Sequence, residues 1–180
     1  PVDALLRVAE VYKDSFRRRF RSAGRLETRT NLLVKDALSE ANASLPFKVT
    51  NNAAALADAW LRRSLVSVLA VGNRPVAGIA TVFQNQSGGR QQRDLSTTYP
   101  GLQERLHDYG MSLILIADGQ GLKEASDRTL TSMFEGVRYP MTLAAAESGA
   151  LAEAIKDLAT AEAPQTVERV ALNKLIEEGP

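Results

Sequence analysis

The sequence predicts a mixed α/β fold in which helices flank a central sheet of mixed strand direction. Three observations carry this prediction. Apolar residues recur every three or four positions through much of residues 1–63, which indicates a mainly helical lead-in. Short apolar runs then alternate with helical segments through residues 64–143, which favours a buried sheet with parallel neighbours. Residues 144–180 again have a helical pattern, so we expect a single domain over residues 1–180.

Three helices are expected in the lead-in. The first one carries a single apolar stripe, and the third one can be capped by an asparagine side chain. A proline-containing connector, residues 42–50, lies between the second helix and the third. The three helices are expected over residues 2–22, over Thr30–Ala41, and from Asn51 or Asn52 to about Arg63.

The sheet core begins with two apolar, β-branched runs that predict a hairpin. A polar, glycine-containing stretch follows, and its composition is typical of a loop. The expected elements are strands Ser64–Val71 and Val76–Phe83 joined by a turn at residues 73–75, a loop over residues 84–97, helix Pro100–Tyr109, strand Met111–Ala117, a turn at residues 118–121, helix Lys123–Phe134, strand Val137–Leu143, and helices Glu147–Ala159 and Gln165–Glu178.

Composition excludes several kinds of site. The 180 residues include no cysteine, which rules out disulfides and cysteine-ligated metals. The single histidine, His107, rules out a histidine-rich metal centre. We therefore expect no metal and no cofactor. No segment reaches the roughly 18 apolar residues of a membrane span, and no signal-peptide pattern opens the chain, so we expect a cytoplasmic protein.

Charge is distributed unevenly although the net charge is only +1. Residues 1–29 hold eight Lys or Arg against four Asp or Glu, whereas residues 144–180 hold three against seven. A basic end and an acidic end suggest a polar partner such as DNA at the basic end, or head-to-tail contact with a protein partner or a second copy. Two solvated helical faces would give the same pattern.

An ordered series of segments resembles a known family. The pieces are VAGIATVFQNQSGGRQQRD, TTYPGLQERLHDYG, MSLILIADGQGL and LTSMFEGVRYPMTL, all between Val76 and Leu143. In this order they resemble the GATC-cutting, DpnII-like type II restriction endonucleases of the PD-(D/E)XK nuclease fold. The resemblance covers roughly 70 residues, and it implies a restriction-endonuclease-like mixed sheet flanked by helices.

The resemblance also implies catalytic positions, and here the sequence departs from the family. Such nucleases place an Asp on one strand and Glu-x-Lys on the next, and these carboxylates hold the Mg²⁺ that activates water. By resemblance the Asp position falls near Ser67, the Glu position at Ala80 and the third position at Val82, while Asn31 is the counterpart of a helix Glu. None of these side chains is a carboxylate, so we expect a catalytically degenerate nuclease fold.

Two basic segments are candidates for nucleic-acid contact. Glycines in the loop permit close approach to a nucleic-acid backbone, its arginines can bind phosphate, and its glutamines can bond base edges. Arginines of the first helix can neutralise phosphates in a groove. The alternatives are a solvated loop and a charged outer helix face. The candidates are Arg90, Gln91, Gln92 and Arg93 in the loop and Arg17, Arg18, Arg21 and Arg25 at the N-terminal end.

Other notable residues have simpler interpretations. Asp118, after a core strand, could be a metal ligand or a general base, but such an Asp more often caps a helix or braces a turn. His107 has no nucleophile motif beside it. Trp60 is expected to be a core or interface anchor. The Gly119–Gly121 pair lacks the third glycine of a dinucleotide fingerprint.

Three functional hypotheses follow. The first is a non-catalytic module that binds nucleic acid or serves as a subunit of a DNA-processing or DNA-defence assembly. The second is an active Mg²⁺-dependent endonuclease with displaced or partner-supplied carboxylates. The third is a protein-interaction module that docks through its acidic C-terminal helices. The displaced carboxylates of the second hypothesis would come from Glu27, Asp94, Glu104 and Asp118.

Overall fold

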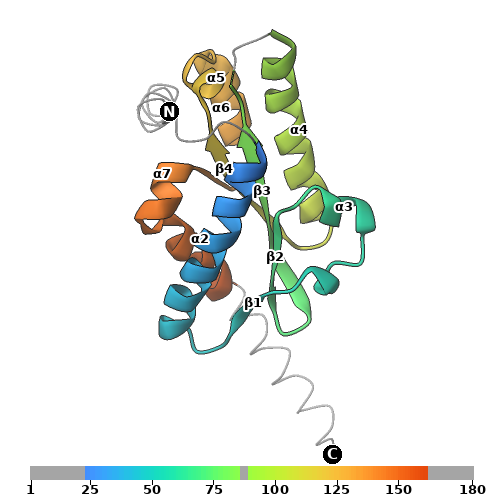
Figure 1. The fold of residues 1–180 in the computed structure, drawn as a ribbon. Helices are drawn as coiled ribbons and strands as arrows, with labels where there is room; N and C mark the ends of the chain where they lie inside the picture. Colours follow the sequence, from blue (N-terminus) through green and yellow to red (C-terminus); the bar gives the residue numbers. More distant parts are fainter. Residues whose placement is uncertain (1–22, 86–88, 162–180) are drawn as a thin grey trace, which may run out of the picture.

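A five-stranded mixed sheet with helices on both faces forms the centre of the molecule (Figure 1). The structure is a computed structural model and describes residues 23–85 and 89–161. The mixed sheet with its flanking helices confirms the prediction of a mixed α/β fold. The strands are β1 (Val49–Asn51), β2 (Ser67–Val71), β3 (Arg74–Phe83), β4 (Ser112–Asp118) and β5 (Tyr139–Thr142). The helices are α2 (Ala23–Ser44), α3 (Ala59–Arg63), α4 (Gly89–His107), α5 (Gln120–Lys123), α6 (Asp127–Glu135), α7 (Leu143–Ala145) and a helix over residues 151–161, with a 3-10 turn η1 (Ala53–Ala55) and a π turn η2 (Ala146–Ala150).

The strands lie in the order β1-β2-β3-β4-β5, and their direction changes at β3. β1, β2 and β3 are antiparallel, whereas β3, β4 and β5 run parallel. β4 lies between two neighbours, and all seven of its residues are buried. Its continuous apolar sequence fits this position because both of its faces are covered by helices. The predicted parallel pairing in the second half and the central place of this strand are confirmed.

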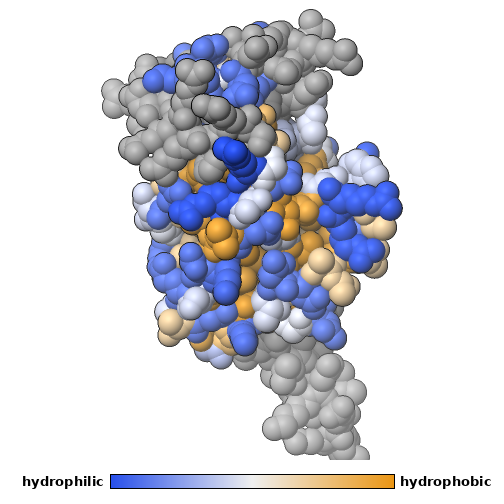
Figure 2. Space-filling model, viewed as in Figure 1, coloured by the Kyte–Doolittle hydropathy of each residue, from blue (hydrophilic) through white to orange (hydrophobic). Residues whose placement is uncertain are grey.

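Two apolar clusters fill the space on either side of the sheet. On one face, α2 and the segment 143–161 cover the side chains of Leu69, Ile79 and Ile116. On the other face, α3, α4 and α6 cover those of Val68, Ala80 and Leu115. The visible surface around α2 is largely hydrophilic, with apolar side chains showing between the polar ones (Figure 2). This pattern is the one expected of an amphipathic helix that packs on a sheet.

The chain between α2 and β2 differs from the prediction of a connector and one helix. Val49–Asn51 form β1, which pairs with Leu69–Val71 of β2. Asn52 accepts a hydrogen bond from the Ala54 N–H and caps only the short turn η1, while α3 begins later. Three residues are too few to show a strand pattern, and cross-strand pairing decides their conformation.

The predicted loop over residues 84–97 is wrong from Gly89 onward, because α4 already begins there. Arg and Gln are good helix formers, and their polarity fits the outer face of a helix as well as a loop. Pro100 was expected to begin the helix but lies inside it. A Cβ atom on Gly136 would lie 2.5 Å from Pro100 Cβ, so proline and glycine let α4 and α6 approach closely.

Smaller differences concern turns and helix ends. The hairpin turns at Gly72, which has φ 60, and Asn73, so Arg74 and Pro75 already belong to β3. The helix expected over Lys123–Phe134 is divided into α5 and α6, the second capped by Ser126. The helices expected over residues 2–22 and 165–178 lie outside the described residues. No helix in the described part of the chain is long and apolar enough to cross a membrane.

Candidate functional site

Asn31, Asn51 and Ser67 meet at the start of β2 and form a small polar notch. Ser67 is the first residue of β2 and is 4% exposed. Its Oγ donates to Asn31 Oδ1 of α2 at 3.4 Å and accepts from Asn51 Nδ2 of β1 at 3.2 Å. The structure therefore brings together two of the four positions that the family resemblance singles out. All three side chains in the notch are neutral.

Ala80 and Val82, the other two positions, lie on the opposite face of the sheet. Both belong to the cluster under α4, whereas Ile79, the pairing partner of Ser67, faces α2. Side chains alternate along a strand, so an offset of one residue moves a position to the other face. By this alternation the Thr81 side chain lies on the face of Ser67, while its backbone carbonyl accepts a hydrogen bond from Tyr99 of α4. Ala80 and Val82 therefore lie apart from the notch that Asn31 and Ser67 share.

The acidic residues considered as displaced ligands do not gather at the notch. Glu27 is exposed near the start of α2, and Glu104 is exposed on α4. Asp118 is buried at the end of β4, and the Asp94 side chain lies outside the described ones. Among the described residues, no three His, Cys, Asp or Glu side chains are close enough to hold a metal ion. The carboxylate of Glu147, which meets α2, forms an ion pair with Arg29 at 3.0 Å.

The Asp-Gly-x-Gly segment makes a tight backbone crossing at the end of β4. The Gln84 N–H donates to the Asp118 carbonyl at 3.1 Å, and the Gly121 N–H donates to the Gln84 carbonyl at 2.8 Å. Gly119 has φ 119, and a Cβ atom there would lie 2.2 Å from the Gln84 oxygen. This geometry gives the segment a structural role in joining β3 to β4. The N-cap of α5 is Gly119.

The predicted nucleic-acid residues are placed only in part. Arg25 is exposed in the first turn of α2, while Arg17, Arg18 and Arg21 lie outside the described residues. Arg90, Gln91, Gln92 and Arg93 lie in the first turns of α4, and only their backbone is described. Residues three apart on a helix share a face, so the backbone places Arg90 and Arg93 on the same side of α4.

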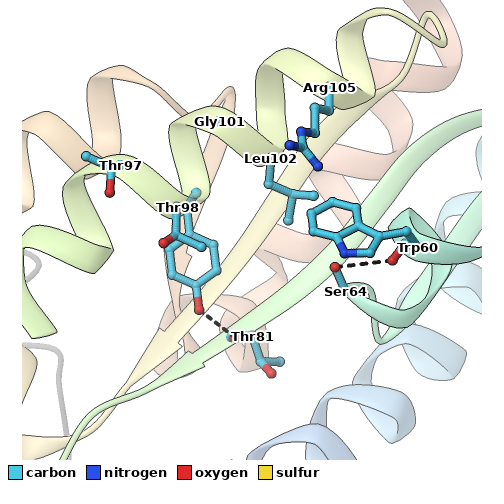
Figure 3. Close-up of a pocket in the computed structure, with 9 residues that line it drawn as sticks. Trp60, Ser64, Thr81, Thr97, Thr98, Gly101, Leu102 and Arg105 are labelled. Atoms are coloured by element: carbon cyan, nitrogen blue, oxygen red, sulfur yellow. Dashed lines mark hydrogen bonds between the residues drawn. The ribbon is translucent and has the colours of Figure 1, made fainter.

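A pocket that the sequence did not predict lies between α3 and α4. Its volume is about 440 Å³, and Figure 3 shows residues from α3, α4 and β3 around it. Trp60, expected in a core or an interface, is 56% exposed at its rim. The Arg105 guanidinium lies over the indole, 4.4 Å from the ring centroid. The lining residues are Trp60, Ser64, Thr81, Thr97, Thr98, Tyr99, Gly101, Leu102 and Arg105.

Hydrogen bonds anchor both walls of the pocket. The Tyr99 hydroxyl donates to the Thr81 carbonyl at 3.3 Å, and burial raises the pKa of Tyr99 to about 12, so it stays a neutral donor. Asp58 caps α3 by accepting from the Trp60 and Leu61 N–H groups and also accepts from the Tyr109 hydroxyl. These bonds, that of Leu61 first, hold the Asp58 pKa below its usual value. An Asp two residues before Trp60 is an N-cap signal that could have predicted the helix start.

Comparison of this chain with protein-family models, with curated proteins and with solved structures finds no match.

Proposed function

We propose that this chain is a nuclease-fold module that binds nucleic acid and does not cleave it. The notch carries the proposal. Asn31 and Ser67 stand where the family resemblance places carboxylates, and they bond to each other as an amide and a hydroxyl. Mg²⁺ prefers ionised oxygen ligands, and a neutral notch offers it neither charge nor a base for water.

The order of elements supports the same proposal. From β3 to β5 the chain runs strand, helix, strand, helix, strand, with β3, β4 and β5 parallel. This order agrees with the layout that the resemblance implies. Such a module would be a subunit of a DNA-processing or DNA-defence assembly. It would bind nucleic acid while a partner protein cleaves or modifies it.

The first test is a cleavage assay. Purified protein with Mg²⁺ or Mn²⁺ is expected to leave duplex and single-stranded DNA intact, at the background rate of a protein-free sample. The contrary outcome is cleavage of DNA that is abolished by a single substitution of Glu27, Glu104 or Asp118. It would support the hypothesis of an active endonuclease with displaced carboxylates.

The second test measures nucleic-acid binding at several salt concentrations. Affinity is expected to fall steeply with salt, because each phosphate contact releases counterions. Arg90→Ala and Arg93→Ala should each weaken binding by about 1 kcal/mol and lower the salt slope by about one unit. Gln91→Ala should relax sequence preference more than affinity if Gln91 bonds a base edge.

Lys48→Ala is the matched control for the arginine variants. Lys48 is exposed just before β1, and Figure 1 shows β1 at the opposite end of the molecule from the start of α4. Its loss should leave affinity and salt slope unchanged. Nucleic-acid binding that is undetectable even at low salt would contradict the proposal and favour the protein-interaction module.

A further inference from the structure

We propose that the pocket between α3 and α4 receives one unpaired nucleobase, which stacks on Trp60. The inference rests on the proposed function and adds to it a preference for single-stranded or locally opened nucleic acid. Size, lining and the exposed aromatic side chain each support it.

The pocket has the size and polarity of a site for a flat, polar ring. A volume of about 440 Å³ lies within the usual range of small-molecule sites. Ser64, Thr97 and Thr98 are among its lining residues, with the Ser64 hydroxyl donating to the Trp60 carbonyl at 3.3 Å, and no acidic side chain lines it among those that the structure describes. Hydroxyls donate and accept, so they can match the mixed donors and acceptors of a base edge without strict selection among bases.

Trp60 supplies the stacking surface. Trp60 is 56% exposed although the Arg105 guanidinium lies over its ring, so part of the side chain is open to a ligand. Aromatic side chains bind unpaired bases through stacking, since every base has a π face. Arginine guanidinium planes stack on bases as well, so Arg105 can contribute a second surface.

Positive charge beside the pocket suits the strand that would carry the base. Arg62 and Arg63 follow Trp60 and Leu61 in the last turn of α3, and both are exposed. They can contact phosphates on either side of the stacked nucleotide. The nearest carboxylate on this helix, that of Asp58, accepts hydrogen bonds from backbone N–H groups and from Tyr109. Asp58 therefore fixes the position of α3, because it caps the helix and links it to the end of α4.

The pocket also distinguishes unpaired from paired bases. In a duplex each base has its faces covered by its neighbours and its Watson–Crick edge by its partner, so stacking on a protein ring requires the base to leave the helix. A single strand offers such bases without this cost. We therefore infer that single strands bind at this pocket more tightly than duplexes of the same sequence.

The single tryptophan of the chain makes the test specific. Trp60 is the only tryptophan among the 180 residues, so a fluorescence titration reports on this pocket alone. A single-stranded oligonucleotide is expected to change Trp60 emission saturably, and the matching duplex to change it less. Anisotropy of a labelled oligonucleotide, measured in parallel, reports total binding wherever it occurs.

Variants then assign the effect to the ring. Trp60→Ala should weaken single-strand binding by about 5- to 150-fold, the range for loss of one base–aromatic stack, and Trp60→Phe should keep part of the affinity. Leu32→Ala is the control, because Leu32 is 53% exposed on α2 and is not among the residues that line the pocket. Far-UV circular dichroism of each variant checks that the fold is retained.

The outcomes separate this inference from the proposed function. In one outcome, anisotropy detects binding, Trp60 emission does not change, and Trp60→Ala binds with the affinity of the wild type. This outcome overturns the pocket assignment and leaves the proposed function standing. Equal emission changes with duplex and single strand overturn the preference for unpaired bases. Absence of binding to both by anisotropy overturns the proposed function and this inference together.

Discussion

At the scale of single residues, Gly119 shows how backbone geometry fixes the end of the central sheet. Its φ of 119 and ψ of 151 fall in a region that only glycine adopts readily. The Gln84 carbonyl accepts the Gly121 N–H beside it, so the Gln84 backbone occupies the space that a side chain at Gly119 would need. The segment can connect β4 to α5 only with glycine at this position.

Gly119→Ala is therefore expected to lower stability more than a glycine-to-alanine substitution that causes only backbone strain. Gly149 also has a positive φ, of 102, but a Cβ there would have no neighbour within 4 Å. Gly149→Ala should cost about 1–2 kcal/mol, the usual strain for a non-glycine residue at positive φ. Gly119→Ala should exceed it by about 2 kcal/mol or more, because backbone must move. Urea unfolding of both variants measures the difference, and equal costs would contradict the steric argument.

The candidate site could be predicted from the sequence only in part, and the reasons lie in individual residues. The sequence alone shows that β2 and β3 contain no carboxylate. This is true at Thr81 as well as at Ala80 and Val82. Which of these faces Ser67 depends on the register between two strands, and a one-residue offset reverses the face. The exposure of Trp60 depends on α3 being short and capped by Asp58, which apolar periodicity does not report.

At the scale of elements, α4 is held against the sheet by a side chain as well as by its apolar face. Gln103 Oε1 accepts the Leu113 N–H of β4 at 2.9 Å and the Arg138 N–H just before β5 at 3.3 Å. One amide oxygen thus joins α4 to two parallel strands. Leu102 and Arg105, which are neighbours of Gln103 on α4, line the pocket.

Gln103→Leu is expected to destabilise the protein by about 1–3 kcal/mol, because two backbone N–H groups lose their acceptor. Gln103→Glu keeps an oxygen at the same position and should retain most of the stability. Chemical denaturation gives both values. A leucine variant as stable as the wild type would show that water replaces the amide oxygen at no cost.

The elements with a clear pattern of apolar residues were the ones that the sequence predicted well. The apolar runs of β2, β3 and β4 identify the sheet, and alternation with helices identifies its parallel half. β1 was missed because Val49–Asn51 adopt a strand through pairing with β2. The start of α4 was missed because a solvated helix with glycine before it has the composition of a loop.

At the scale of the whole molecule, the sheet joins two apolar clusters that do not share side chains. Leu115 and Ile116 are neighbours on β4, and both are fully buried. Leu115 belongs to the cluster under α3, α4 and α6, whereas Ile116 belongs to the cluster under α2 and residues 143–161. A loss of packing on either side therefore acts on the same central strand.

We expect this common strand to make unfolding a single cooperative transition. Leu115→Ala and Ile116→Ala should each lower stability by about 2–5 kcal/mol, the range for large-to-small changes in a core. Trp60 fluorescence reports on the α3 side, and far-UV circular dichroism reports on all helices. In each variant the two signals should shift together, because a two-state domain loses both clusters at once. If Ile116→Ala lowers the midpoint seen by circular dichroism and leaves the Trp60 midpoint in place, the two faces unfold independently, and the α3–α4 side with its pocket is a separate folding unit.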